Sequence, residues 1–159
     1  MRRVVVTGMA GITPLGTEWS DIRDAFEEKR TGVRYISDWD RLRDLRTRLG
    51  APADYFDHAR IFPRKKIRSM GRVAVMGVWS AQEALARAGL IDDPILTSGR
   101  VGVAFGSSYG STEPTKGFVH FMETGEAAGL SATSYIKMMS HTAVINIGVF
   151  FGLTGRVIT

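Results

Sequence analysis

The stretch VVVTGMAGITPLG, from Val4 to Gly16, joins an apolar run typical of a buried strand to a turn that holds three glycines and a proline. A dinucleotide-binding fold opens in a similar way, because its pyrophosphate must approach bare backbone at the start of a helix. The GxGxxG pattern, counted from Gly8, would require a glycine at position 10, where Ala10 stands. Pro14 also lacks an N–H group for a phosphate oxygen. We therefore interpret this stretch as a buried first strand that enters an irregular glycine turn.

The composition is that of an ordinary globular domain. The chain has 159 residues, of which 44% are hydrophobic and 23% charged, so it can bury a substantial core. It contains no cysteine, which excludes disulfides, thiolate metal sites and a cysteine nucleophile within these residues. The uncharged segment 138–155 includes several polar residues and is more typical of a buried helix than of a membrane span. We expect a cytoplasmic protein without a membrane partner.

The net charge of +5 is concentrated in one place. RIFPRKKIR runs from Arg60 to Arg68, and no carboxylate follows until Glu83. Such a local positive field favours an acidic partner, although a solvated basic turn is the alternative. We do not expect nucleic acid as the partner, because the run does not alternate cations with aromatic side chains for base stacking.

The spacing of apolar residues predicts four helices joined by strands and loops. The second helix is rich in Ala and Gly, which predicts close packing in a crowded interior. The last helix is apolar nearly all round, which predicts burial on all sides. Strands that alternate with helices imply right-handed crossovers and a mostly parallel sheet with helices on both faces. The predicted elements are a strand from Val4, a helix between an N-cap at Thr17 and a stop at Gly32, an irregular segment over 33–62, a helix over 70–88 that ends at Gly89, a strand over 100–105, a helix over 114–124, a helix over 138–151 that ends at Gly152, and a strand from about Val157.

The sequence contains none of the familiar arrangements of catalytic residues. The three histidines are scattered, and none has the spacing of a metal-ligand pair. The letters GSSYG, Gly106 to Gly110, place Ser108 at the centre of a GxSxG pattern, but the elements expected around it are a strand and a loop, with no histidine partner suggested nearby. A hydrolase would depend on Ser108 alone. We therefore expect neither a metal site nor a hydrolytic site.

Four stretches, taken in order, resemble the β-ketoacyl-acyl-carrier-protein synthases, the elongating condensing enzymes. RRVVVTGMAGITPLG resembles their first strand and glycine turn, with Ala10 in place of the second glycine, and RKKIRSMGRVAVMGVWSAQEAL resembles their basic stretch and Ala-rich helix. VGVAFGSSYGS resembles their strand and glycine loop, and KMMSHTAVINIGVFFGLTGRVIT the segment that leads into their active site. The resemblance implies an α/β, thiolase-like fold whose N-terminal half has a mostly parallel sheet between helical layers. Residues 1–159 would then be the N-terminal portion of a ketosynthase domain.

The function implied by this resemblance is that of a 3-oxoacyl-[acyl-carrier-protein] synthase. Such an enzyme performs a decarboxylative Claisen condensation in fatty acid or polyketide synthesis, without a metal or redox cofactor. Its partners would be acyl carrier protein and a second subunit, in a homodimer or a heterodimer with a homologue. The family's nucleophilic cysteine is expected about five residues beyond the position that matches Thr159, so this chain alone would hold no catalytic residue and be inactive. The alternatives are a non-catalytic chain-length factor, a thiolase-like coenzyme A enzyme and a stand-alone carrier-binding module.

The resemblance also assigns binding residues to two places. Tyr109 replaces a usually smaller side chain at the family's gate, which suggests a shortened or reshaped pocket that favours short, unsaturated or aryl-bearing acyl chains. Part of the pocket lining would come from the second subunit. The carrier-protein contacts would be Arg64, Lys65, Lys66 and Arg68, and the acyl pocket residues Gly106, Ser107, Ser108, Tyr109, Met138 and Met139.

Overall fold

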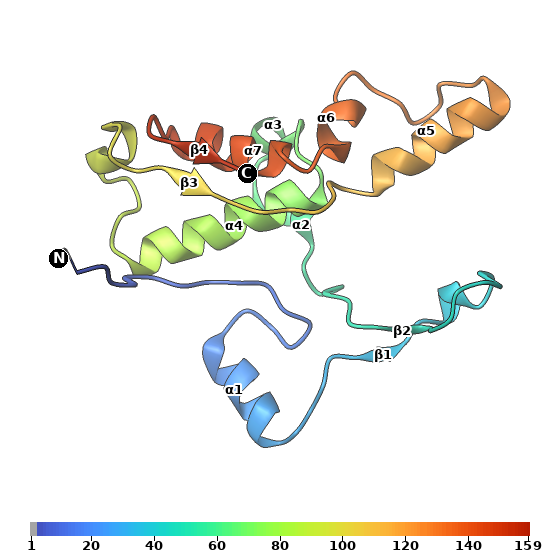
Figure 1. Ribbon diagram of the computed structural model, residues 1–159, viewed down its shortest axis with the longest axis horizontal. Coiled ribbons are helices and arrows are strands. Elements are labelled where there is room, and N and C mark those ends of the chain that lie inside the picture. Colours follow the sequence, from blue (N-terminus) through green and yellow to red (C-terminus); the bar gives the residue numbers. More distant parts are fainter. Residues whose placement is uncertain (1–2) are drawn as a thin grey trace. The chain divides into compact units, whose positions relative to one another are not determined.

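The structure is a computed structural model that describes residues 3–159 (Figure 1). The chain forms two compact units, one made of residues up to Ala10 together with residues 58–159, and the other of residues 11–57. The first unit contains all the residues that the sequence assigns to carrier binding and to the acyl pocket.

The unit over residues 11–57 is built from one helix and a small hairpin. Helix α1 spans Trp19–Glu27, and strands β1, Arg34–Tyr35, and β2, Leu49–Gly50, pair antiparallel on either side of the 3₁₀ turn η1, Ser37–Trp39. The sequence predicted the helix and the irregular segment after it, but not the hairpin.

The predicted ends of α1 are wrong. The N-cap position is held by Glu18 rather than Thr17, and the helix stops well before Gly32. Lys29 takes a left-handed conformation, with φ 55°, and Arg30 N–H donates to the carbonyl of Ala25 at 2.8 Å. This local turn satisfies the last carbonyls of the helix, so no glycine is needed to end it.

The core of the first unit lies between two helices that pack against each other, α4, Arg72–Arg87, and α7, Thr142–Phe151. Val75, Val78 and Ile147 are among its buried side chains. A Cβ atom added at Gly77 would lie 3.3 Å from Ile147 Cδ1 and 3.3 Å from Phe105 Cζ, so the helix surfaces are in close contact there. The close packing predicted from the Ala and Gly content of α4 is confirmed.

The two strands of the first unit pair in parallel, as predicted. Strand β3, Val103–Ala104, lies beside β4, Val157–Ile158, in the register Val103 to Val157. Helices α5, Glu113–Thr124, α6, Ser134–Met138, and α7 occupy the long connection between them (Figure 1). The remaining elements are the short helices α2, His58–Ile61, and α3, Arg64–Ile67, and the 3₁₀ turn η2, Pro94–Thr97.

The predicted buried strand at Val4 is wrong. No strand pairs with residues 3–10 within the described chain, and the side chain of Val4 is 93% exposed. The side chains of an extended segment stay in solvent when no strand pairs with it and no helix packs over it. Gly8 instead approaches the end of α4, where an added Cβ would lie 2.2 Å from Ala84 O and 2.9 Å from Ala88 N. The absence of a side chain at Gly8 is therefore explained by backbone packing rather than by a phosphate.

The predicted helix over 138–151 is two helices. Helix α6 ends at Met138, Met139 is extended, and α7 begins at Thr142, whose hydroxyl donates to the carbonyls of Ile136 and Met139, at 2.7 Å each. Burial on all sides is also wrong, because Val149 is 75% exposed. Helix α7 packs on α4 and contacts β3 and β4, whereas Ile145 and Val149 remain exposed. None of the described helices is both long enough and apolar enough to cross a bilayer.

Candidate functional site

Helix α3 carries the predicted carrier contacts on the surface. Its one buried side chain, Ile67, anchors the short helix in the core, and Pro63 stands at the N-cap position. The four cations around this anchor are all exposed, and among residues 3–159 no carboxylate forms a salt bridge with them. These residues, called the α3 cations below, are Arg64, Lys65, Lys66 and Arg68.

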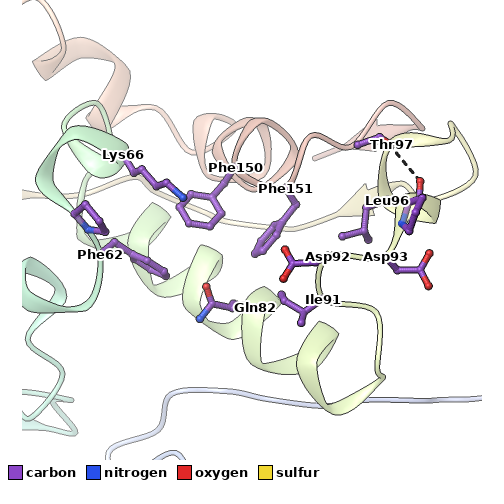
Figure 2. Close-up of a pocket in the computed structure, with 12 residues that line it drawn as sticks. Phe62, Lys66, Gln82, Ile91, Asp92, Asp93, Leu96, Thr97, Phe150 and Phe151 are labelled. Atoms are coloured by element: carbon purple, nitrogen blue, oxygen red, sulfur yellow. Dashed lines mark hydrogen bonds between the residues drawn. The ribbon is translucent and has the colours of Figure 1, made fainter.

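An aromatic hollow lies beside the α3 cations. It has a volume of about 530 Å³ and lies between α3, α4, η2 and the end of α7. Figure 2 shows Lys66 directed toward the ring of Phe150, and the Nζ atom is 5.4 Å from the ring centroid. Phe62 and Phe150 meet edge to face with centroids 5.0 Å apart, as do Phe150 and Phe151. No local sequence pattern indicates this hollow, because Phe62 is far in the chain from the adjacent Phe150 and Phe151.

The glycine loop over 106–111 lies next to the end of α6. Gly110 N–H donates to the carbonyl of Met138 at 3.2 Å, and Ser111 N–H donates to that of Lys137 at 2.8 Å. Gly110 is buried, and an added Cβ would lie 2.3 Å from Met138 O. Two segments assigned to the acyl pocket are thus adjacent in space. Met138 and Met139 do not start a long helix, however, but close α6 and lead into α7.

The ring of Tyr109 faces α5. Its hydroxyl lies 3.1 Å from Thr115 Oγ1, and the side chain is half exposed. Ser107 Oγ donates to the carbonyl of Tyr109 at 2.6 Å, whereas Ser108 is exposed. The tyrosine borders an open hollow of about 450 Å³ along α5, with Val119 on its wall. Within residues 3–159, no cluster of His, Asp and Glu is arranged to hold a metal ion.

Ser111, the last residue of the glycine loop, connects this loop to α4. It is 2% exposed, and its Oγ accepts the N–H of Val73 in the first turn of α4 at 3.0 Å. The two residues are 38 positions apart, so no local pattern reveals the contact. The glycine loop is therefore bonded both to α6 and to the helix that follows the α3 cations.

Comparison with known proteins identifies the family. Residues 1–159 match the family described as "Beta-ketoacyl synthase, N-terminal domain". The chain belongs to the β-ketoacyl synthase family. A solved β-ketoacyl synthase from Burkholderia phymatum STM815 is 44% identical, with a TM-score of 0.90, over 99% of this chain and 39% of that chain. The predicted α/β, thiolase-like fold is confirmed, and the ishigamide ketosynthase/chain length factor shares the fold, with 19% identity and a TM-score of 0.74.

Curated relatives of this chain are longer than the chain itself. The 3-oxoacyl-[acyl-carrier-protein] synthase 2 of Synechocystis sp. is 32% identical over 109 residues, which are 69% of this chain and 26% of the relative. Nodulation protein E of Rhizobium meliloti is 30% identical over 159 residues, which are 98% of this chain and 38% of the relative. The chain thus spans less than two fifths of the length of these relatives.

Proposed function

We propose that this β-ketoacyl synthase is a 3-oxoacyl-[acyl-carrier-protein] synthase, of which residues 1–159 form the N-terminal portion of the ketosynthase domain. An acyl group passes from a carrier thioester to an enzyme thiol and releases the carrier thiol. Malonyl-carrier then loses CO₂, and its carbon attacks the acyl-enzyme, forming a carbon–carbon bond while the enzyme thiol leaves. The product is 3-oxoacyl-carrier. The names of curated relatives from Synechocystis and Coxiella support this reaction.

The single observation that carries the proposal is the cluster of exposed α3 cations without a carboxylate partner among the described residues. A carrier protein presents an acidic helix and a phosphate on its pantetheine arm. Clustered cations attract such a partner over a distance and orient it, and the attraction weakens as salt rises. The cations on α3 are held by the buried Ile67, so they form a fixed patch rather than a flexible tail.

The acyl pocket is proposed where the glycine loop meets α6. The backbone bonds of Gly110 and Ser111 hold the loop against Met138 and Lys137. Tyr109 borders a hollow large enough for part of a small apolar ligand. We propose that its ring limits the length or shape of the acyl chain, and that Tyr109→Gly shifts preference toward longer saturated chains. An unchanged chain-length preference would refute this role.

The enzyme is further proposed to be a cytoplasmic dimer. The lack of cysteine in these residues suits a reducing compartment. Helix α5 exposes Phe118, Val119 and Met122 and buries none of its residues within the described chain, which leaves an apolar face for another subunit or segment.

Binding of acyl-carrier protein to the intact protein at increasing salt tests the proposal. The variant Lys65→Glu with Arg68→Glu reverses two of the α3 cations. Two opposite charges 4 Å apart in water attract by about 1 kcal/mol. Charge reversal replaces this attraction by repulsion at each of the two positions, so the double variant loses about 2–4 kcal/mol of binding free energy before screening by salt. We expect affinity to fall about 30-fold or more at low salt, with a flatter salt dependence.

Arg43→Glu with Arg46→Glu is the matched control. It changes the net charge equally at exposed positions of the other unit, where aspartates alternate with the arginines. Carrier binding by this control should equal that of the parent. If both double variants bind alike, or if coenzyme A thioesters are used as well as carrier thioesters, the proposed carrier site is wrong.

A further inference from the structure

The buried serine of the glycine loop connects three segments of the first unit. Ser111 Oγ accepts the N–H of Val73 at 3.0 Å, and Ser111 N–H donates to Lys137 O at 2.8 Å. The neighbouring Gly110 N–H donates to Met138 O at 3.2 Å. One short stretch of loop is therefore fixed to the start of α4 and to the end of α6.

The start of α4 depends on this distant hydroxyl. The first N–H groups of a helix have no partner within the helix and are usually satisfied by the N-cap side chain. The N-cap of α4 is Gly71, which has no side chain to accept a hydrogen bond. An added Cβ at Gly71 would lie 2.2 Å from Ser111 Oγ, so the serine occupies the place of a local cap.

The contact joins two segments that adjoin the proposed binding regions in the chain. The α3 cations precede the start of α4, and Tyr109 precedes Ser111 in the same loop. Without the hydroxyl, the partly buried bond from Val73 N–H loses its acceptor, which is costly enough for the loop end to shift or admit water. Small displacements of positioned groups have large kinetic effects in enzymes.

We propose that Ser111 is a positioning residue that sets the acyl-chain preference by holding the loop that carries Tyr109. The inference rests on the proposed function, because it assumes that this loop forms a wall of the acyl pocket. It predicts that Ser111 affects the preference for acyl-chain length through the ring of Tyr109. Without this ring, the Ser111 hydroxyl should no longer affect that preference.

The test is a double-mutant cycle in the intact enzyme, with the ratio of kcat/KM for decanoyl-carrier to that for butyryl-carrier as the readout. Ser111→Ala should shift the ratio toward the longer chain by about threefold to tenfold. In the Tyr109→Gly background, Ser111→Ala should produce no further shift. Ser134→Ala is the matched control, because the hydroxyl of this 7% exposed serine bonds only to nearby Ser131, accepting its N–H at 3.0 Å and lying 3.2 Å from its Oγ. It should lower stability and leave the ratio unchanged.

The outcomes separate the inference from the proposed function. If Ser111→Ala does not fold, Ser111→Cys keeps the shape with a weaker acceptor and should shift the ratio in the same direction. A folded Ser111 variant with the parental ratio, or an equal shift with and without the Tyr109 ring, overturns the positioning role while the parent remains an active condensing enzyme. A parent enzyme without condensing activity on any acyl-carrier substrate overturns the proposed function itself.

Discussion

Replacing Gly110 by alanine tests whether the glycine loop and α6 are in direct backbone contact. The added Cβ would lie 2.3 Å from Met138 O and 2.6 Å from Lys137 O. Both neighbours are backbone atoms, so no side-chain rotation relieves the contact. Ordinary contact begins at 3.4 Å, so the two segments must separate by about 1.1 Å, which is the difference between 3.4 and 2.3 Å.

This separation has two energetic consequences. Forced backbone shifts in packed regions typically cost about 1–3 kcal/mol. The 3.2 Å hydrogen bond from Gly110 N–H to Met138 O would also break, at a net cost of about 1 kcal/mol. We therefore expect Gly110→Ala to lower the free energy of unfolding by about 2–4 kcal/mol. In a folding unit of about 150–250 residues, that change corresponds to a fall in Tm of about 4–16 °C.

Thermal and urea unfolding followed by circular dichroism measure this change, with Gly106→Ala as the control in the same loop. An added Cβ at Gly106 has no atom within 4 Å, and its φ is not positive, so this variant should be neutral or slightly stabilising. Equal stability of the two variants would refute the contact between the loop and α6.

Three further changes test other parts of the structure. Gly8→Ala should lower the free energy of unfolding by about 1–3 kcal/mol because of its contact with Ala84 O, and an unchanged urea midpoint would contradict that packing. The hydrogen bond to Asp40 raises the pKa of Tyr35 above 10.0, so the resulting stability is present below pH 10 and is lost as pH rises through the raised pKa. Burial also raises the pKa of Tyr55, so absorbance titration should show late tyrosines of which Tyr35→Phe removes one, and an unchanged late fraction would disprove the bond. Asp93→Ala removes the side-chain cap of η2 and should cost about 1 kcal/mol in thermal unfolding, whereas no loss would mean that the cap is unimportant.

Local signals in the sequence were sufficient to predict where several helices end. Helices α5 and α7 stop at Gly125 and Gly152, which adopt left-handed conformations with φ 75° and 64°. Gly89, with φ 70°, follows α4 in the same way. These ends depend on neighbouring residues alone and could therefore be predicted.

Other features depend on partners that are distant in the chain. The apolar run at Val4 has strand composition, but a strand also requires a neighbour, and none is present in the described chain. The bond from Val73 N–H to Ser111 Oγ spans 38 residues and has no sequence signature. The α3 cations were visible as a charge run, whereas their freedom from carboxylates became apparent only in three dimensions.

The most direct test of the proposed function is to incubate the intact protein with butyryl-carrier and malonyl-carrier and to measure the mass of the carrier-bound product. The proposed function predicts 3-oxohexanoyl-carrier, with release of CO₂ and free carrier, and a strong loss of rate when Lys65 and Arg68 are replaced by glutamate. Absence of this product, or an equal rate with coenzyme A thioesters in place of both carriers, would contradict it.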